Sequence, residues 1–207
     1  MIEGFNYMNY IVVAYYTIDT LYELHVKVLR KSLHKFNLPH HIQPVDSLGN
    51  WNKNCNYKPT FLKQMMKEYF PLSIVYVDCD AEFVRHPILF DSLDCNIGLF
   101  ELDKRKYYPQ REYKKGVEYK ETCSGTIFLN NNLKVMSLLD LWERECEEHR
   151  GQWDQRNLQN VICNDFYRLP PEYCCIDGTM NMIQNPVIVH HQASRKVRKN
   201  KGRLVLA

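Results

Sequence analysis

The feature of the sequence that most constrains its fold is a short apolar run that ends in two acidic residues. Ile74 to Val77 are apolar and β-prone, and Asp78-Cys79-Asp80 follow directly. This pattern predicts a buried strand that opens into a charged loop at its carboxyl end. Ligands of open α/β sheets bind just beyond such strand ends, where two acids are costly unless a cation neutralises them. A divalent cation that also binds substrate phosphates is the simplest explanation, and a solvated acidic turn is the alternative.

Length and composition indicate a single α/β domain. The chain has 207 residues, of which 45% are hydrophobic, and its formal net charge of +3 does not by itself imply a nucleic-acid partner. No apolar run approaches the roughly 20 residues of a membrane-spanning helix, and residues 1–6 lack the basic and apolar regions of a signal peptide. We therefore expect a soluble, cytoplasmic protein without a membrane span, or a domain of a longer, virus-encoded protein.

The eight cysteines do not predict a metal or disulfide framework. None of them forms a Cys-x-x-Cys pair, so a zinc site has little support. The size of the chain and its start argue against a disulfide-stabilised secreted domain. We expect reduced and mostly buried thiols.

The first half of the chain reads as a nucleotide-binding α/β unit. A strand at 10–16, a polar turn at 17–20 and a helix at 21–36 have this order. A short strand at 41–45, an Asn-rich loop at 51–57 and a helix that begins at Lys58 follow. In the first turn, Thr17, Asp19 and Tyr22 have groups suited to a ribose or a base, although Thr17 or Asp19 could instead cap the helix.

The second half alternates further strands and helices. Strands are predicted at 96–101, 122–130 and 187–190, and helices at 133–149 and 153–162. Residues 103–121 combine lysines, arginines and tyrosines without clean periodicity, which is typical of a functional or mobile loop. This composition suits sugars and also nucleic acid. Residues 195–207 form a basic tail.

Taken together, these motifs resemble the glycosyltransferases of the GT-A fold. That family has a hydrophobic strand followed by Asp-x-Asp, here Asp78-Cys79-Asp80, and then a proline-led segment, here Pro87-Ile88-Leu89-Phe90. The Ser124-Gly125 strand, the Asp154-Gln155 pair and the histidine after Val189 stand in the family's order. The size is similar to that of small enzymes from bacteria and from viruses, including large algal viruses. The resemblance implies one GT-A domain over residues 1–207, with a mixed, mostly parallel central sheet flanked by helices.

The resemblance also implies a function and a set of site residues. The reaction would move a sugar from a nucleotide diphosphate sugar, with UDP-sugar favoured, to a hydroxyl of a glycan or another acceptor. Residues 103–121 would lie on the acceptor side. Mn²⁺ or Mg²⁺ would be held by Asp78, Asp80 and one of His190 and His191, of which His190 is favoured because adjacent strand residues face opposite ways. The donor-binding residues implied are Thr17, Asp19, Tyr22, Lys58, Asp78, Ser124, Gly125, Gln155, Arg195 and Lys196.

Several roles stay open at this stage. Asp154 and Glu101 are candidates for a general base, but Asp154 could equally be a helix cap. Lys58 could contact the base or a phosphate, or be solvated. Two other classes compete: a sugar-nucleotide nucleotidyltransferase, although residues 17–20 lack its glycine-rich loop, and a non-catalytic module that binds carbohydrate or nucleic acid.

Overall fold

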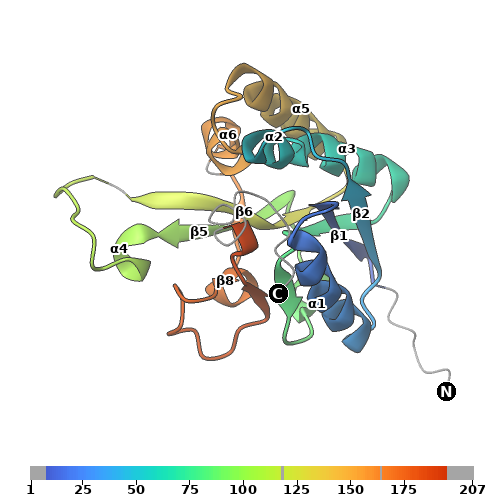
Figure 1. Ribbon diagram of the computed structural model, residues 1–207, viewed down its shortest axis with the longest axis horizontal. Helices are drawn as coiled ribbons and strands as arrows, with labels where there is room; N and C mark the ends of the chain where they lie inside the picture. Colours follow the sequence, from blue (N-terminus) through green and yellow to red (C-terminus); the bar gives the residue numbers. More distant parts are fainter. Residues whose placement is uncertain (1–7, 118, 164, 195–207) are drawn as a thin grey trace.

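The computed structural model describes residues 8–117, 119–163 and 165–194, and it confirms the α/β class (Figure 1). The larger sheet contains β1 (Tyr10–Thr17), β2 (His40–Val45), β3 (Ser73–Val77), β5 (Ile97–Asp103), β6 (Lys120–Leu129) and β7 (Tyr167–Arg168). The smaller sheet contains β4 (Ala81–Phe83), β8 (Cys175–Ile176) and β9 (Ile188–His190). The helices are α1 (Tyr22–Lys35), α2 (Trp51–Asn56), α3 (Lys58–Glu68), α4 (Lys104–Tyr107), α5 (Leu133–Glu148) and α6 (Asp154–Val161), with 3-10 turns η1 (Ile88–Asp91) and η2 (Pro171–Cys174).

The larger sheet has six strands in the order β2-β1-β3-β6-β5-β7. Neighbours pair in parallel except at β6, which runs antiparallel to both β3 and β5. The sheet is therefore mixed and mostly parallel, as predicted. Because β1 and β3 are parallel neighbours in this order, the loops that follow them open at the same edge of the sheet.

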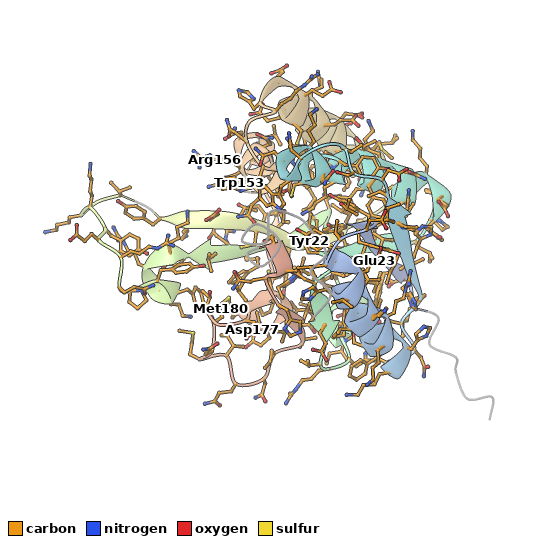
Figure 2. All side chains as sticks on the ribbon, in the orientation of Figure 1. Tyr22, Glu23, Trp153, Arg156, Asp177 and Met180 are labelled. Carbon is orange, nitrogen blue, oxygen red and sulfur yellow. The ribbon has the colours of Figure 1, made fainter. Side chains whose placement is uncertain are left out.

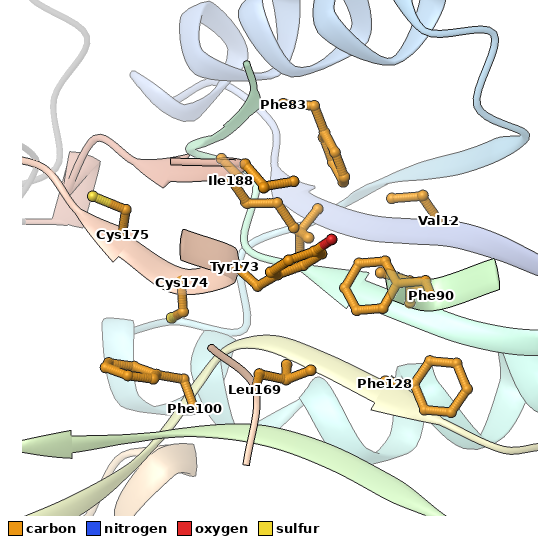
Figure 3. Packing of buried hydrophobic residues seen from close by; sticks show 14 of the residues in the cluster. Val12, Phe83, Phe90, Phe100, Phe128, Leu169, Tyr173, Cys174, Cys175 and Ile188 are labelled. Carbon is orange, nitrogen blue, oxygen red and sulfur yellow. The ribbon is translucent and has the colours of Figure 1, made fainter. Parts of the chain in front are cut away.

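Both faces of this sheet are covered, as Figure 1 shows: α2, α3, α5 and α6 lie on one face, and α1 with the small sheet on the other. Alternate residues of β1 divide between the two layers, with Val13 in the layer that includes α3 and α5 and Val12 in the layer that includes α1. Burial on both faces explains why the strand is a continuous apolar run. Figure 3 shows part of the second layer, where Phe90 and Phe128 stack with ring centroids 6.1 Å apart.

Two segments differ from the sequence prediction. Residues 51–56 form α2 rather than a loop, because the Asn50 side chain caps the helix by accepting a hydrogen bond from the Lys53 N–H at 2.9 Å. The segment 103–121 is only partly loop: it includes the end of β5, all of α4 and the start of β6. The two long strands make it a projecting hairpin (Figure 1).

All eight cysteines are free thiols, and five of them are buried: Cys79, Cys123, Cys146, Cys174 and Cys175. None of the helices in the part of the chain that the structure describes is long and apolar enough to cross a membrane.

Candidate active site

A cavity of about 260 Å³ opens where β1 and β3 end. The walls come from both halves of the chain, because α2, β6 and the start of α6 all border it. Its lining includes seven of the residues predicted for the site, Thr17, Tyr22, Lys58, Asp78, Asp80, Ser124 and Gln155, and also Asp154. The other lining residues are Tyr15, Tyr16, Trp51, Asn54, Cys55, Tyr76, Cys79, Trp153 and Ser194.

Asp78, Asp80 and His190 form a cluster, and its two aspartates line this cavity. Each offers one ligand atom, and these atoms all lie within 4.8 Å of one another. The two aspartates are brought together by a tight turn after β3, closed by the Ala81 N–H, which donates to the Asp78 carbonyl at 2.9 Å. His190 arrives from the other end of the chain because β9 pairs antiparallel with β4, placing it opposite Ala81.

Within this cluster, each of the three residues has one atom engaged by neighbouring groups of the protein. Asp78 Oδ1 accepts from Tyr76 and Lys58, and Asp80 Oδ2 accepts from the Ala193 N–H at 2.7 Å. His190 Nε2 contacts the hydroxyl of a buried threonine, Thr126, at 2.8 Å, while its Nδ1 lies 3.6 Å from Asp80 Oδ1. Two carboxylate oxygens and one imidazole nitrogen are a donor set that suits Mn²⁺ or Mg²⁺.

The charge balance of the cluster also favours a cation. Burial opposes ionisation of His190, but Cys174 and the carboxylate of Asp80 outweigh it and raise the pKa of this imidazole to about 10. Burial likewise acts to raise the pKa of Asp80, but hydrogen bonding and attraction to His190 lower it overall. A site that draws a proton onto its histidine in this way has an excess of negative charge, which a divalent cation would neutralise.

Because Gly125 has no side chain, it leaves room for the side chains of Asp78 and His190. A Cβ at this position would lie 3.2 Å from His190 Cε1 and 3.3 Å from Asp78 Oδ2, so any side chain would press on both groups. Its carbonyl accepts the Asp78 N–H at 2.8 Å, which fixes the start of the acidic turn against β6.

Lys58 is buried, with only 3% of its surface exposed, so the solvated interpretation was wrong. Its Nζ lies 2.7 Å from Asp154 Oδ2 and 3.1 Å from Asp78 Oδ1, and it also donates to Ser124. Burial alone would lower the pKa of this amine, but Asp154 and Asp78 raise it overall. One buried ammonium thus ties the acidic turn to α6.

The start of α6 points into the site instead of capping the helix. Asp154 is the first helical residue, and no side chain caps the helix, so the capping interpretation was wrong. The Ser124 hydroxyl donates to Asp154 Oδ2 at 2.7 Å. Gln155 Oε1 accepts the Ser124 N–H at 3.1 Å, and its Nε2 donates to Glu121 Oε1 at 2.6 Å.

Of the three residues predicted at the first turn, two line the cavity and one does not. Thr17 is the buried last residue of β1 and Tyr22 the first of α1, and both line the cavity. Neither Thr17 nor Asp19 caps α1, because the Thr20 hydroxyl instead accepts the Tyr22 N–H. Asp19 is exposed, does not line the cavity, and adopts a φ of 57°.

Four other predicted residues lie apart from the cavity or outside the described structure. Glu101 is on β5, where its carboxylate pairs with Lys120 and Arg168, each at 3.2 Å, and it is not among the lining residues. Arg195 and Lys196 lie outside the described residues. His191 turns away from the cluster: its Nε2 lies 2.9 Å from Glu82 Oε2.

Sequence reasoning missed the aromatic part of the cavity. Trp51 and Trp153 lie with ring centroids 6.4 Å apart, and Trp153 is 43% exposed. Figure 2 shows Trp153 beside the start of α6 and Tyr22 at the start of α1. The sequence signal for this part of the cavity is Trp153, which stands directly before the Asp154-Gln155 pair. Its partner Trp51 gives no such signal, because the sequence predicts a loop where the structure has α2.

Comparison with solved structures identifies the fold. A glycosyltransferase involved in the glycosylation of the major capsid of PBCV-1 superposes with a TM-score of 0.63 at 11% identity, covering 92% of this chain and 98% of that one. The galactosyltransferase LgtC in complex with donor and acceptor sugar analogues gives 0.55 at 11% identity, covering 95% and 98%. The glycosyltransferase GlyE of Streptococcus pneumoniae TIGR4 gives 0.57 at 14% identity, covering 88% of this chain and 55% of that one.

No protein-family model and no curated protein sequence matches the chain. At these identities the structural likeness establishes the fold. The chain has the GT-A fold of the glycosyltransferases, as its sequence motifs had indicated.

Proposed function

We propose that this protein is a metal-dependent glycosyltransferase. It transfers a sugar from a nucleoside diphosphate sugar, with UDP-sugar favoured, to a hydroxyl of a glycan or another acceptor. The observation that carries this proposal is the cluster of Asp78, Asp80 and His190, whose two carboxylates line a cavity of the GT-A fold. A carboxylate-rich site of this kind needs a cation, and the diphosphate of a sugar nucleotide is a substrate that brings anionic oxygens to one.

In this proposal Mn²⁺ or Mg²⁺ is the resident cofactor, held by Asp78, Asp80 and His190. A bound cation of this kind neutralises the negative charge that builds on the leaving diphosphate. Thr126 supports the site from behind, because its contact with Nε2 keeps Nδ1 of the His190 ring directed at the two carboxylates. The backbone of Gly125 lies against His190 and Asp78.

The donor nucleoside is assigned to the end of the cavity bordered by Thr17 and Tyr22. A hydroxyl and an aromatic ring there suit a ribose and a base. Ser124 and Gln155 border the opposite end, near α6, and are assigned to the sugar. Ser194 also lines the cavity, which supports a role for the next two residues, Arg195 and Lys196, at the diphosphate.

Asp154 is the acidic residue placed to act on the transferred sugar or the acceptor. Its Oδ2 is engaged by Lys58 and Ser124, so the second carboxylate oxygen, Oδ1, is not the one that these two residues hold. That oxygen is the one left to accept a proton or a hydroxyl contact. Glu101 is a weaker candidate for a general base, because its carboxylate is already paired with two cations on the sheet.

Calorimetry with UDP tests the metal assignment. UDP should bind in Mn²⁺ and lose most of its affinity in chelator or in Asp80→Ala, whereas Asp165→Ala, which removes an exposed acid paired with Lys134, should bind UDP normally. Equal UDP affinity with and without metal would contradict the assignment.

A panel of UDP-sugars with Mn²⁺ then tests the reaction, through release of UDP by slow hydrolysis of the correct donor. Release of pyrophosphate from a nucleoside triphosphate and a sugar phosphate would instead identify the protein as a nucleotidyltransferase.

A further inference from the structure

The positive charge of this protein is concentrated in two segments. Residues 104–117, here called the basic arm, contain six of the 27 lysines and arginines and one of the 24 acidic residues. Residues 195–207 contain six more lysines and arginines and no acid, so the rest of the chain has 15 cations against 23 acids. An acidic body with a basic projection orients an anionic partner, because it attracts the partner at one place and repels it elsewhere.

The basic arm has a defined shape. The guanidinium of Arg105 donates to the carbonyls of Lys114 and Val117 at 3.0 and 2.7 Å. The Tyr113 hydroxyl lies 2.6 Å from the Lys104 carbonyl, to which it donates. These contacts fold the tip of the hairpin back onto α4. The arm therefore presents its remaining cations from a preformed surface, which lowers the ordering cost of binding.

Four cations of the arm are left for a partner: Lys106, Arg111, Lys114 and Lys115. All four are exposed, and the described part of the chain shows no carboxylate within ion-pair distance of them. Arg111 lies over the ring of Tyr108, with 4.4 Å from its guanidinium carbon to the ring centroid. A cation on an aromatic face keeps its charge and hydrogen-bond donors, so this contact positions the group without neutralising it.

The arm leads into the proposed active site. From Lys120, at the base of the arm, strand β6 runs to Ser124 in the cavity wall, a distance of about 13 Å at the usual rise of a strand. At the start of helix α6, Figure 2 shows Trp153 and Arg156 on the side of the molecule from which the hairpin projects. Both are exposed, and Trp153 also lines the cavity, so an aromatic ring and a further cation lie on the same side as the arm.

We propose that the acceptor is an acidic glycan, with carboxylate or phosphate groups along its chain, that lies on the basic arm while its acceptor end enters the cavity past Trp153. This proposal rests on the proposed glycosyltransferase function. A sugar ring has an apolar face that stacks on an indole, and Trp153 provides that surface beside the site where a hydroxyl must arrive. The arm cations contact the acidic groups further along the chain.

Binding of defined polysaccharides tests the proposal on the whole 207-residue chain. The probes are fluorescently labelled polygalacturonate, which carries carboxylates, and neutral dextran of similar length. The arm variant is Lys114→Glu with Lys115→Glu, and the matched control is Lys27→Glu with Lys31→Glu, which reverses two exposed lysines on α1. Melting temperatures and UDP affinity in Mn²⁺ are measured for all three proteins.

The wild type and the control should bind polygalacturonate with an affinity that falls as salt rises, and neither should bind dextran. The arm variant should lose about tenfold or more of that affinity while keeping its melting temperature and its UDP affinity. Failure to bind UDP in the wild type would refute the proposed function, whereas unchanged polygalacturonate binding in the arm variant would refute the acceptor proposal alone. Loss of binding only on truncation after Ser194, or tighter arm-dependent binding of duplex DNA, would overturn it as well.

Discussion

Removal of the Lys58 ammonium should destabilise the fold far more than removal of a partly exposed lysine with similar partners. Lys58 lies between two carboxylates, at 2.7 Å from Asp154 and 3.1 Å from Asp78, and its side chain is 4% exposed. Lys58→Met keeps most of the volume but leaves buried negative charge without compensation. Removing one partner of a buried ion pair lowers the free energy of unfolding by about 3–5 kcal/mol. For a chain of this size, that loss corresponds to a fall in Tm of about 6–20 °C.

Lys63→Met is the matched control. Lys63 also contacts two carboxylates, Asp140 at 2.7 Å and Glu143 at 2.6 Å, but its side chain is 20% exposed and that of Asp140 is 51% exposed. Water screens such a pair, so its loss should cost only about 0–1 kcal/mol. Both variants are unfolded in urea and by heat, with chelator present so that no metal contributes to stability.

The destabilisation by Lys58→Met should also depend on pH. Without the ammonium, burial opposes the ionised form of the carboxyl that Lys58 contacts at 2.7 Å in the folded protein. A group with a raised folded pKa contributes stability below the unfolded pKa and loses it as pH rises, so the deficit is largest at neutral pH and shrinks as the pH falls. Adding Asp154→Asn to Lys58→Met should recover part of the loss at neutral pH. Equal losses in Lys58→Met and Lys63→Met, or a deficit that does not change with pH, would refute this reasoning.

Three further substitutions test the site. Asp154→Asn should leave UDP affinity nearly intact and reduce sugar transfer by about a hundredfold or more; unchanged transfer with a lower melting temperature would show a structural role only. Gly125→Ala should weaken Mn²⁺-dependent UDP binding, because its Cβ would press on His190, whereas Gly151→Ala, with no atom within 4 Å of its added Cβ, should not; equal binding by both would contradict the close approach. His190→Gln should abolish the metal dependence of UDP binding measured by calorimetry, whereas His191→Gln should retain it, and the reverse result would reassign the ligand.

The sequence by itself determined the fold class and most of the element order. Strands β1 and β3 are buried on both faces, so the sequence of each is a continuous apolar run. Such a run can be recognised without knowing which strands pair with it. The helices that cover the sheet show their buried sides through apolar spacing. The acidic pair after β3 was also evident, because carboxylates at the end of a buried strand require an explanation wherever the rest of the chain lies.

Only the tertiary structure decided which residues meet. The resemblance had placed His190 with Asp80, but the short pairing of β9 with β4 that joins them has no local signature in the sequence. Lys58 looked like a solvated residue at a helix start until Asp154 and Asp78 were seen on either side of its ammonium. Side-chain chemistry and periodicity are local properties that a sequence displays directly, whereas the choice of partner for a charge depends on how distant elements pack, and that is settled only when the whole chain folds.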